Sequence, residues 1–389
     1  MEFISRFHIF VMLWINPVQI LIFNIKAMRR IKRMVFSAAL LLMMIYTGLA
    51  IENSKANPEN DADTSYAKCS GTAVVITGAA ARIAQEAALL EQLDRSGWLK
   101  DVCFISGSSS GALNAIVLNA ILDKKFTWGR YQAILFMITD DKIYLRNERS
   151  LPVNINPFRN LLTQVVNDSL GYRRIGDLPV NSAISVSDIS ALPPHTDTYR
   201  LSNIRINRES NPDIDLVEAL MATSAIPLIF PPAKFNDSSG LPRSAFIDGG
   251  LADDHLPYKA VLQFEKFRQS RVDTLIIVSR KSDITPNMND ELQKFDLYES
   301  RLSGKLGLWF EGMAKNGFLK SMKELQKNYP DLASRTYVYI PDFAENFPLL
   351  NFNNMQQQYK VTAAWAMVHK PVLLSSYLAQ AEAEEQVEK

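Results

Sequence analysis

The sequence predicts an α/β fold: a three-layer α/β/α arrangement in which helices cover both faces of a mostly parallel central sheet. Two strand–turn–helix units follow one another early in the chain, and the second contains Gly-Ser-Ser-Ser-Gly at residues 107–111. Successive units of this kind are typical of parallel sheets with helical crossovers. The composition agrees with a folded globular chain, since 47% of the 389 residues are hydrophobic and 21% are charged. The chain is therefore long enough for one large α/β domain.

Residues 1–66 are expected to precede the folded part as a signal peptide or membrane anchor followed by a polar linker. A basic stretch at residues 29–33 comes before an uncharged apolar stretch at 34–49, which is the layout of a secretory signal peptide. Met28 is then an alternative start, with an over-extended gene start before it. An uncleaved anchor and a pair of membrane helices, which would use residues 7–25, remain alternatives. We expect export, to a secreted or membrane-associated location.

A catalytic domain is predicted over residues 71–282, and a helical extension packed on it over residues 283–389. Apolar runs predict strands at residues 73–77, 102–105, 183–189, 199–206 and 274–279. Helical periodicity predicts helices at residues 84–93, 112–118 and 216–223, and further helices at 290–335 and 355–389.

The pentapeptide at residues 107–111 has the form of a nucleophile elbow. It stands between the apolar run at 102–105 and an apolar-periodic segment, so it does not resemble a flexible Gly/Ser linker. Ser109 alone lies midway between Gly107 and Gly111. These two positions must be nearly free of side chain if the turn holds the middle serine in a strained conformation. Ser109 is therefore the candidate nucleophile.

A serine hydroxyl needs a base to take its proton. The histidines after it are His195, His255 and His369, of which His255 and His369 would serve a Ser–His–Asp esterase. Asp248 is a different candidate for the base, because it follows a short apolar run and is followed by Gly249 and Gly250. Such an aspartate can act directly as the base if its surroundings are dry enough to raise its basicity.

Composition excludes other classes of function. The net charge is +1, which gives no indication of a nucleic-acid partner. Four histidines and two cysteines in the whole chain do not make a multi-ligand metal cluster. We expect no metal and no organic cofactor.

The chain resembles the patatin-like phospholipases, acyl hydrolases with a Ser–Asp dyad and no catalytic histidine. Residues 107–115 match the elbow and helix of that family, and residues 248–250 match its Asp-Gly-Gly motif. Residues 219–232 are similar to the segment that the family carries before this aspartate, and the first turn, residues 77–82, occupies the place of its Gly-rich oxyanion loop. The resemblance runs from about residue 73 to residue 279 and implies a patatin-like fold.

The first turn departs from the family pattern. Gly78 and Arg82 are present, whereas Ala79, Ala80 and Ile83 replace glycines. An alanine keeps its N–H group for an oxyanion hole but resists a positive φ. The resemblance implies that the oxyanion is held by the amides of Gly78, Ala79 and Ala80, together with the amide of Ser110 in the elbow. Arg82 is a candidate either for stabilising the loop or for binding a phosphate head group, because its fork matches phosphate geometry.

These observations predict a lipid acyl hydrolase of the phospholipase A or lysophospholipase type, with Ser109 as nucleophile and Asp248 as base. The expected partners are a phospholipid or other acyl ester and a membrane surface. Two alternatives remain. The replaced loop glycines allow a catalytically impaired member that acts in lipid binding or interaction, and His255 or His369 allows a Ser–His–Asp esterase.

Overall fold

The computed structural model describes residues 67–68, 71–145, 152–189, 197–235, 245–252, 254–282 and 301–387. Within these ranges, eight strands form one sheet in the order β10-β9-β8-β2-β3-β4-β5, with β6 also paired to β4. The strands are β2 (Thr72–Ile76), β3 (Val102–Ser108), β4 (Asn181–Asp188), β5 (Asp197–Ser202), β6 (Phe246–Asp248), β8 (Thr274–Val278), β9 (Thr336–Tyr339) and β10 (Val372–Leu373). Two short strands, β1 (Ala67–Lys68) and β7 (Ser270–Arg271), pair separately.

The sheet is mostly parallel, as the sequence predicts. The five strands β9, β8, β2, β3 and β4 run parallel to their neighbours, whereas β5, β6 and β10 pair antiparallel. All five parallel strands therefore end at one edge, which is where ligands bind in open α/β sheets.

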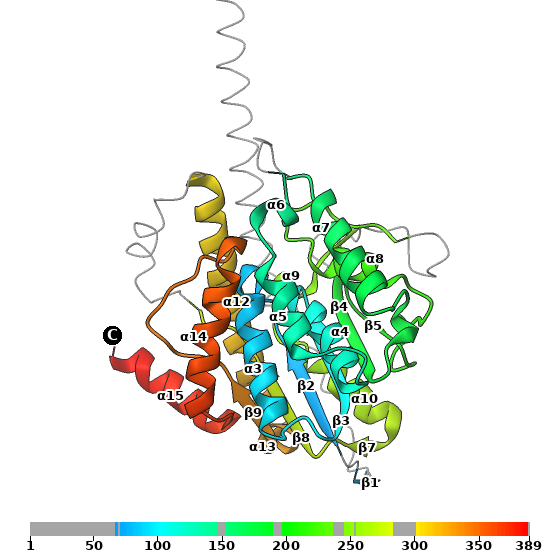
Figure 1. The fold of residues 1–389 in the computed structure, drawn as a ribbon. Helices are drawn as coiled ribbons and strands as arrows, with labels where there is room; N and C mark the ends of the chain where they lie inside the picture. The colour runs from blue at the N-terminus through cyan, green and yellow to red at the C-terminus, as the bar shows by residue number, and fades with distance from the viewer. Residues whose placement is uncertain are drawn as a thin grey trace, which may run out of the picture. The chain divides into compact units, whose positions relative to one another are not determined.

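Alternation along the strands builds the two helical layers. Val74 and Ile76 of β2 face one side, against the helices α3, α4 and α14, which lie in front of the sheet in Figure 1. Ala73 and Val75 face the other side, against α10, α12, α13 and α15. Because successive strand residues point to opposite faces, a strand that is apolar on both faces is covered on both. The result is the predicted three-layer α/β/α fold.

Twelve helices and four short helical turns surround the sheet in the described part of the chain. The helices are α3 (Ile83–Arg95), α4 (Ser110–Leu122), α5 (Trp128–Phe136), α6 (Asp140–Ile143), α7 (Asn156–Leu162), α8 (Leu216–Thr223), α9 (Gly249–Ala252), α10 (Lys259–Arg268), α12 (Arg301–Asn328), α13 (Pro330–Ser334), α14 (Met355–Val368) and α15 (Leu374–Val387), and the turns are η1 (Ala80–Arg82), η2 (Thr163–Ser169), η3 (Ile175–Asp177) and η5 (Phe352–Asn354).

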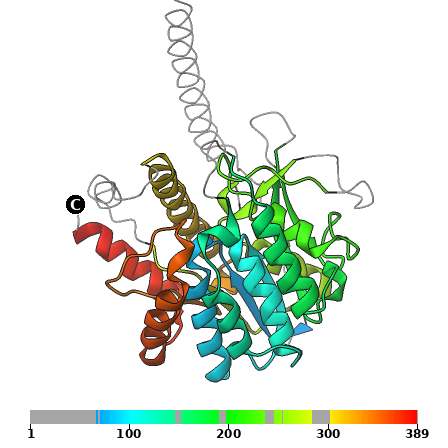
Figure 2. The same cartoon turned by 45° about the horizontal axis from the view of Figure 1, so that its top comes forward.

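The C-terminal part differs from the helical extension that the sequence predicts. It contains α12 to α15, but it also supplies β9 and β10 to the central sheet. Figure 2 shows its helices gathered at one side of the molecule. The four residues of β9, Thr-Tyr-Val-Tyr, are too few for their alternation to stand out between two helical patterns.

Several expectations lie outside the described residues. They are the signal peptide or anchor with its linker, over residues 1–66, the alternative start at Met28, and the turn that contains His195. Among the residues that the structure does describe, no helix is both long and apolar enough to cross a membrane.

Candidate active site

The turn between β3 and α4 has the strained geometry that the glycine spacing predicts. Ser109 has φ 52° and ψ −133°, a left-handed conformation that a non-glycine residue adopts only under constraint. A Cβ on Gly107 would lie 2.7 Å from the carbonyl oxygen of Gly111, and one on Gly111 would lie 2.1 Å from that of Thr77. Both positions therefore need glycine. Ser109 itself is only 5% exposed and lines a pocket.

A residue of α8 holds the backbone of this turn. The amide of Ser109 donates to Thr223 Oγ1 at 2.8 Å, and Thr223 Oγ1 donates to the carbonyl of Ser185 in β4 at 2.6 Å. The side chain of Asp215 caps the start of α8 by accepting from the amide of Glu218 at 3.0 Å. Sequence reasoning missed Thr223, although it lies in the segment 219–232 that resembles the family.

Asp248 ends β6 next to the serine. Its amide donates to the carbonyl of Ala225 at 3.1 Å, and the amide of Gly250 donates to its Oδ1 at 2.8 Å. Burial raises the pKa of Asp248 from 3.8 to about 7, while hydrogen bonds from the Ser109 side chain and from the amides of Gly250 and Leu251 lower it. The structure therefore brings the predicted nucleophile and the predicted base into direct contact.

The glycines after Asp248 allow this approach. A Cβ on Gly249 would lie 2.7 Å from the carbonyl oxygen of Ser185, and one on Gly250 would lie 2.7 Å from Ser108 Oγ. The backbone of Ser185 and the buried side chain of Ser108 cannot give way easily at that distance. The pair thus lets the turn after β6 pack against β4 and the elbow.

The four amides that the sequence predicts as oxyanion donors fall into two groups. Gly78 and Ala80 line the pocket with Ser109, and Ser110 is the first residue of α4. Among the described residues, no acceptor takes a hydrogen bond from the amides of these three. The amide of Ala79, by contrast, donates to Ser110 Oγ at 2.8 Å, and Ala79 is buried away from the pocket. Ala79 is therefore engaged in holding the two turns together.

Ala80 adopts a positive φ of 45°, although an alanine resists this conformation. Partners distant in sequence hold the loop on either side of it. The amide of Ala81 donates to the carbonyl of Leu349 at 2.9 Å, and Ala81 is fully buried.

Arg82 does not face the pocket, which corrects the prediction of a phosphate-binding residue. Its side chain is 0% exposed and pairs with both carboxylate oxygens of Glu311 in α12, with Nη2 to Oε2 at 2.9 Å. Its Nε donates to the carbonyl of Phe347 at 2.6 Å, and Nη1 also donates to that of Lys281. These hydrogen bonds hold the loop to the C-terminal part. They also engage the N–H donors of the guanidinium that a ligand would need.

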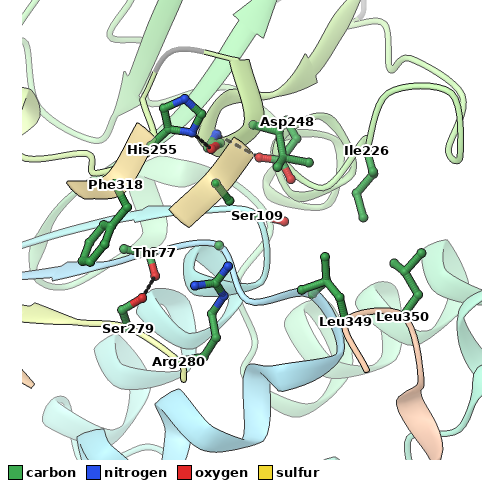
Figure 3. Close-up of a pocket in the computed structure, with 15 residues that line it drawn as sticks. Thr77, Ser109, Ile226, Asp248, His255, Ser279, Arg280, Phe318, Leu349 and Leu350 are labelled. Atoms are coloured by element: carbon green, nitrogen blue, oxygen red, sulfur yellow. Dashed lines mark hydrogen bonds between the residues drawn. The ribbon is translucent and has the colours of Figure 1, made fainter. Parts of the chain in front are cut away.

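The pocket above Ser109 and Asp248 is lined by both polar and apolar side chains (Figure 3). Thr77, Ser279 and Arg280 are among the polar and charged ones. The apolar ones are Ile226, Leu251, Ala314, Phe318, Leu349 and Leu350. Sequence reasoning did not assign Arg280, Leu349 or Leu350 to the site, because no motif marks them.

The structure separates the two histidines that were proposed as alternative bases. His255 lines the pocket, its Nδ1 lies 2.7 Å from the carbonyl oxygen of Gly250, and its ring packs against Gly317 of α12. His369 lies at the end of α14 and stacks on Trp365, with ring centroids 4.3 Å apart. It is exposed and does not line the pocket, so the prediction that it could serve as the base is wrong.

No group of three or more His, Cys, Asp or Glu side chains in the described part of the chain is arranged to hold a metal ion. The described pocket offers a buried carboxylate, a strained serine, backbone amides, the imidazole of His255 and one guanidinium.

Comparison with known proteins identifies the domain. Residues 74–262 match the family model of the patatin-like phospholipases, and no curated protein matches significantly. A solved structure, VipD from Legionella pneumophila, matches over 79% of this chain and 70% of that chain with 12% identity and a TM-score of 0.33; the assignment rests on the family model instead. The matched segment contains both Ser109 and Asp248, and the chain therefore carries a patatin-like phospholipase domain, which places it among the lipid acyl hydrolases.

Proposed function

We propose that this protein hydrolyses lipid acyl esters, of the phospholipase A or lysophospholipase type, with Ser109 as nucleophile and Asp248 as general base. The observation that carries the proposal is the contact between these two side chains. A carboxylate whose pKa burial raises to about 7 accepts a hydrogen bond from a serine held at positive φ. A base with a pKa near the working pH is suited to take the serine proton.

The reaction can be derived from this geometry. Asp248 takes the hydroxyl proton as Ser109 Oγ attacks the ester carbonyl, and the amides of Gly78, Ala80 and Ser110 hold the developing oxyanion. The N-terminus of α4 adds a favourable dipole. The proton passes to the departing alcohol. Asp248 then activates the water that hydrolyses the acyl-enzyme, and the proton it takes from that water returns to Ser109.

Labelling with a fluorophosphonate probe tests the nucleophile. We expect the wild-type protein to be labelled and Ser109→Ala not to be labelled, with its ester hydrolysis lower by about 10,000-fold or more. Ser108→Ala is the matched control in the same motif. The Oγ of Ser108 is buried and makes no hydrogen bond among the described residues, so its removal should leave labelling intact.

The base is tested by Asp248→Asn, for which we expect a loss of about 100- to 10,000-fold in kcat. A protein that keeps its activity without Asp248 but loses it in His255→Ala would have the Ser–His arrangement instead. A hydrolysis screen over phospholipids, lysophospholipids and neutral glycerides then defines the lipid class.

One observation favours a second candidate, a catalytically impaired member that acts in lipid binding or interaction. The amide of Ala79 is engaged with Ser110, which leaves one donor fewer than the sequence led us to expect. Loss of one oxyanion donor lowers kcat by about 100- to 1000-fold. A folded wild-type protein that the fluorophosphonate never labels would support this candidate.

We also propose export through the N-terminal segment and action at a membrane surface. The support is the basic stretch 29–33 before the apolar stretch 34–49. Expression from Met1 and from Met28, followed by N-terminal sequencing of the exported protein, distinguishes a cleaved signal peptide from an anchor.

A further inference from the structure

One cationic side chain in the pocket has no part in the reaction proposed above. Arg280 comes shortly after β8 and is only 5% exposed, yet it lines the pocket with Ser109. Among the described residues of the lining, it is the one with a permanent positive charge. Figure 3 shows its guanidinium directed into the pocket from the side of Thr77 and Ser279.

The register of the sheet explains this placement. Ile76 of β2 pairs with Val278 of the parallel strand β8, so the two chains leave the sheet side by side. Thr77 Oγ1 and Ser279 Oγ lie 2.6 Å apart. The next residues along the two chains, Gly78 and Arg280, therefore border the same part of the pocket, next to the amides proposed to hold the oxyanion.

A buried acid lies behind this wall. Glu86 of α3 accepts from Thr77 Oγ1 and from Asn114 Nδ2, each at 3.1 Å. Burial raises the pKa of Glu86 to about 8, whereas the charge of Arg280 lowers it. The charges of Glu86 and Arg280 therefore interact across this wall of the pocket.

We propose that Arg280 forms an anion-binding subsite that selects acyl esters with a phosphate group near the scissile bond. The inference rests on the proposed function and deepens it. The pocket lining supplies apolar side chains that can contact an acyl chain and one guanidinium, and Ser109 lines the same pocket. An amphiphile whose ester joins an acyl chain to a phosphate fits this lining. A guanidinium fork matches phosphate oxygens, and its charge-assisted hydrogen bonds are strong in a buried site.

Two substrates that differ only in the phosphate test the subsite: 1-oleoylglycerol 3-phosphate and 1-oleoylglycerol, in the same detergent micelles. We expect Arg280→Met to lower the ratio of their kcat/KM values by about 10- to 100-fold, and Arg280→Lys to lower it less. Lys281→Met is the matched control. The Lys281 ammonium binds the carbonyl of Glu345 and the side chain of Asn346 away from the pocket, so its removal should leave the ratio unchanged.

Three results would overturn the proposal. An equal loss on both substrates would mean that Arg280 acts on the oxyanion or on the fold. An equal change in Lys281→Met would mean that general surface charge sets the preference. An unchanged ratio with weaker inhibition by oleate would mean that Arg280 binds the carboxylate of the released acid.

Binding to inactive protein separates this inference from the proposed function. In the Ser109→Ala background we expect Arg280→Met to weaken binding of 1-oleoylglycerol 3-phosphate by a similar factor, as measured by calorimetry, whether or not Ser109 is a nucleophile. If Arg280→Met does not fold, Arg280→Met/Glu86→Gln removes both of the interacting groups, and the ratio of kcat/KM values for the two substrates is measured in that variant instead.

Discussion

Two turns face each other at the carboxyl edge of the sheet, and they are stabilised in different ways. The elbow after β3 and the first loop after β2 each hold a non-glycine residue at positive φ, Ser109 at 52° and Ala80 at 45°. In the elbow the conformation depends on two glycines of the turn itself, because Gly107 and Gly111 admit backbone atoms that no side chain would allow, and Thr223 of α8 binds the amide of Ser109. In the first loop the constraint comes from Leu349, among other distant partners.

The difference shows where a strained conformation can be read from local sequence. The elbow needs small residues at two fixed positions, so its pattern is visible in five letters. The loop lacks the family's glycines and is held by Glu311 and by the carbonyls of Phe347 and Leu349. These three lie beyond the segment 74–262 that the family model matches. The C-terminal part thus stabilises a loop that has alanines at positions 79 and 80.

The largest effect is expected in the elbow. Gly111→Ala would place a Cβ 2.1 Å from the carbonyl oxygen of Thr77, so the turn cannot close against the first loop. We expect loss of folded protein or of all fluorophosphonate labelling, measured on the soluble fraction.

Gly129→Ala is its control, because a Cβ there meets nothing within 4 Å and the residue lies in the helix α5. It should be neutral or stabilise by about 0.5–1 kcal/mol. A Gly111→Ala protein that folds and is labelled normally would show that the elbow is not constrained by this contact.

The next effect is expected at the anchor of the first loop. Glu311→Gln leaves the guanidinium of Arg82 buried without its ion pair, with side chains that are 0% and 1% exposed in the pair. We expect the free energy of unfolding to fall by about 3–5 kcal/mol, measured by denaturant titration, and labelling of Ser109 to slow.

The exposed pair of Arg174 and Asp213, with side chains 63% and 70% exposed, provides the comparison. Asp213→Asn should cost less than about 1 kcal/mol. Equal losses in both variants would contradict the idea that the buried pair anchors the loop.

The same contrast explains how much could be predicted from the sequence. The α/β fold and the contact of Ser109 with Asp248 come from patterns that are local: apolar runs, a glycine on each side of a serine, and glycines after an aspartate. The phosphate-binding role for Arg82 and the oxyanion-donor role for Ala79 were wrong because their partners, Glu311 and Ser110 Oγ, are set by packing between segments that are separate in the sequence. Arg280 lies in no recognisable motif of the sequence. It reaches the pocket because of the register between β2 and β8.

The pH dependence of kcat/KM tests Asp248, the residue that contacts Ser109 of the elbow. Because the pKa of Asp248 is raised to about 7, kcat/KM should rise through pH 7 and be about 100-fold below its plateau at pH 5. A rise centred near pH 4 would contradict the buried-base assignment.

The free energy of unfolding should fall as the pH rises, which is opposite to the change in kcat/KM. The stabilising contribution of a raised carboxyl pKa is fully present below pH 3.8, the unfolded value, and is lost as the pH rises through 7. In Asp248→Asn the decline in unfolding free energy from pH 4 to pH 7 should therefore be smaller than in the wild type. Glu86, whose pKa is also raised, contributes the same sign to both proteins and cancels in the difference.

The smallest effects distinguish the two alanines of the first loop. Ala80→Gly removes the strain of a left-handed alanine, about 1–2 kcal/mol, against about 0.5–1 kcal/mol of added chain entropy in the unfolded state. We expect a net gain in unfolding free energy of up to about 1.5 kcal/mol. Ala79 has φ −126°, so Ala79→Gly relieves no strain and should destabilise by about 0.5–1 kcal/mol. Opposite signs in thermal unfolding would show that strain sits at residue 80 alone. If Ala80→Gly instead lowers stability, the distant anchors do not hold this residue at positive φ in solution, and the proposed division between a locally and a remotely stabilised turn fails.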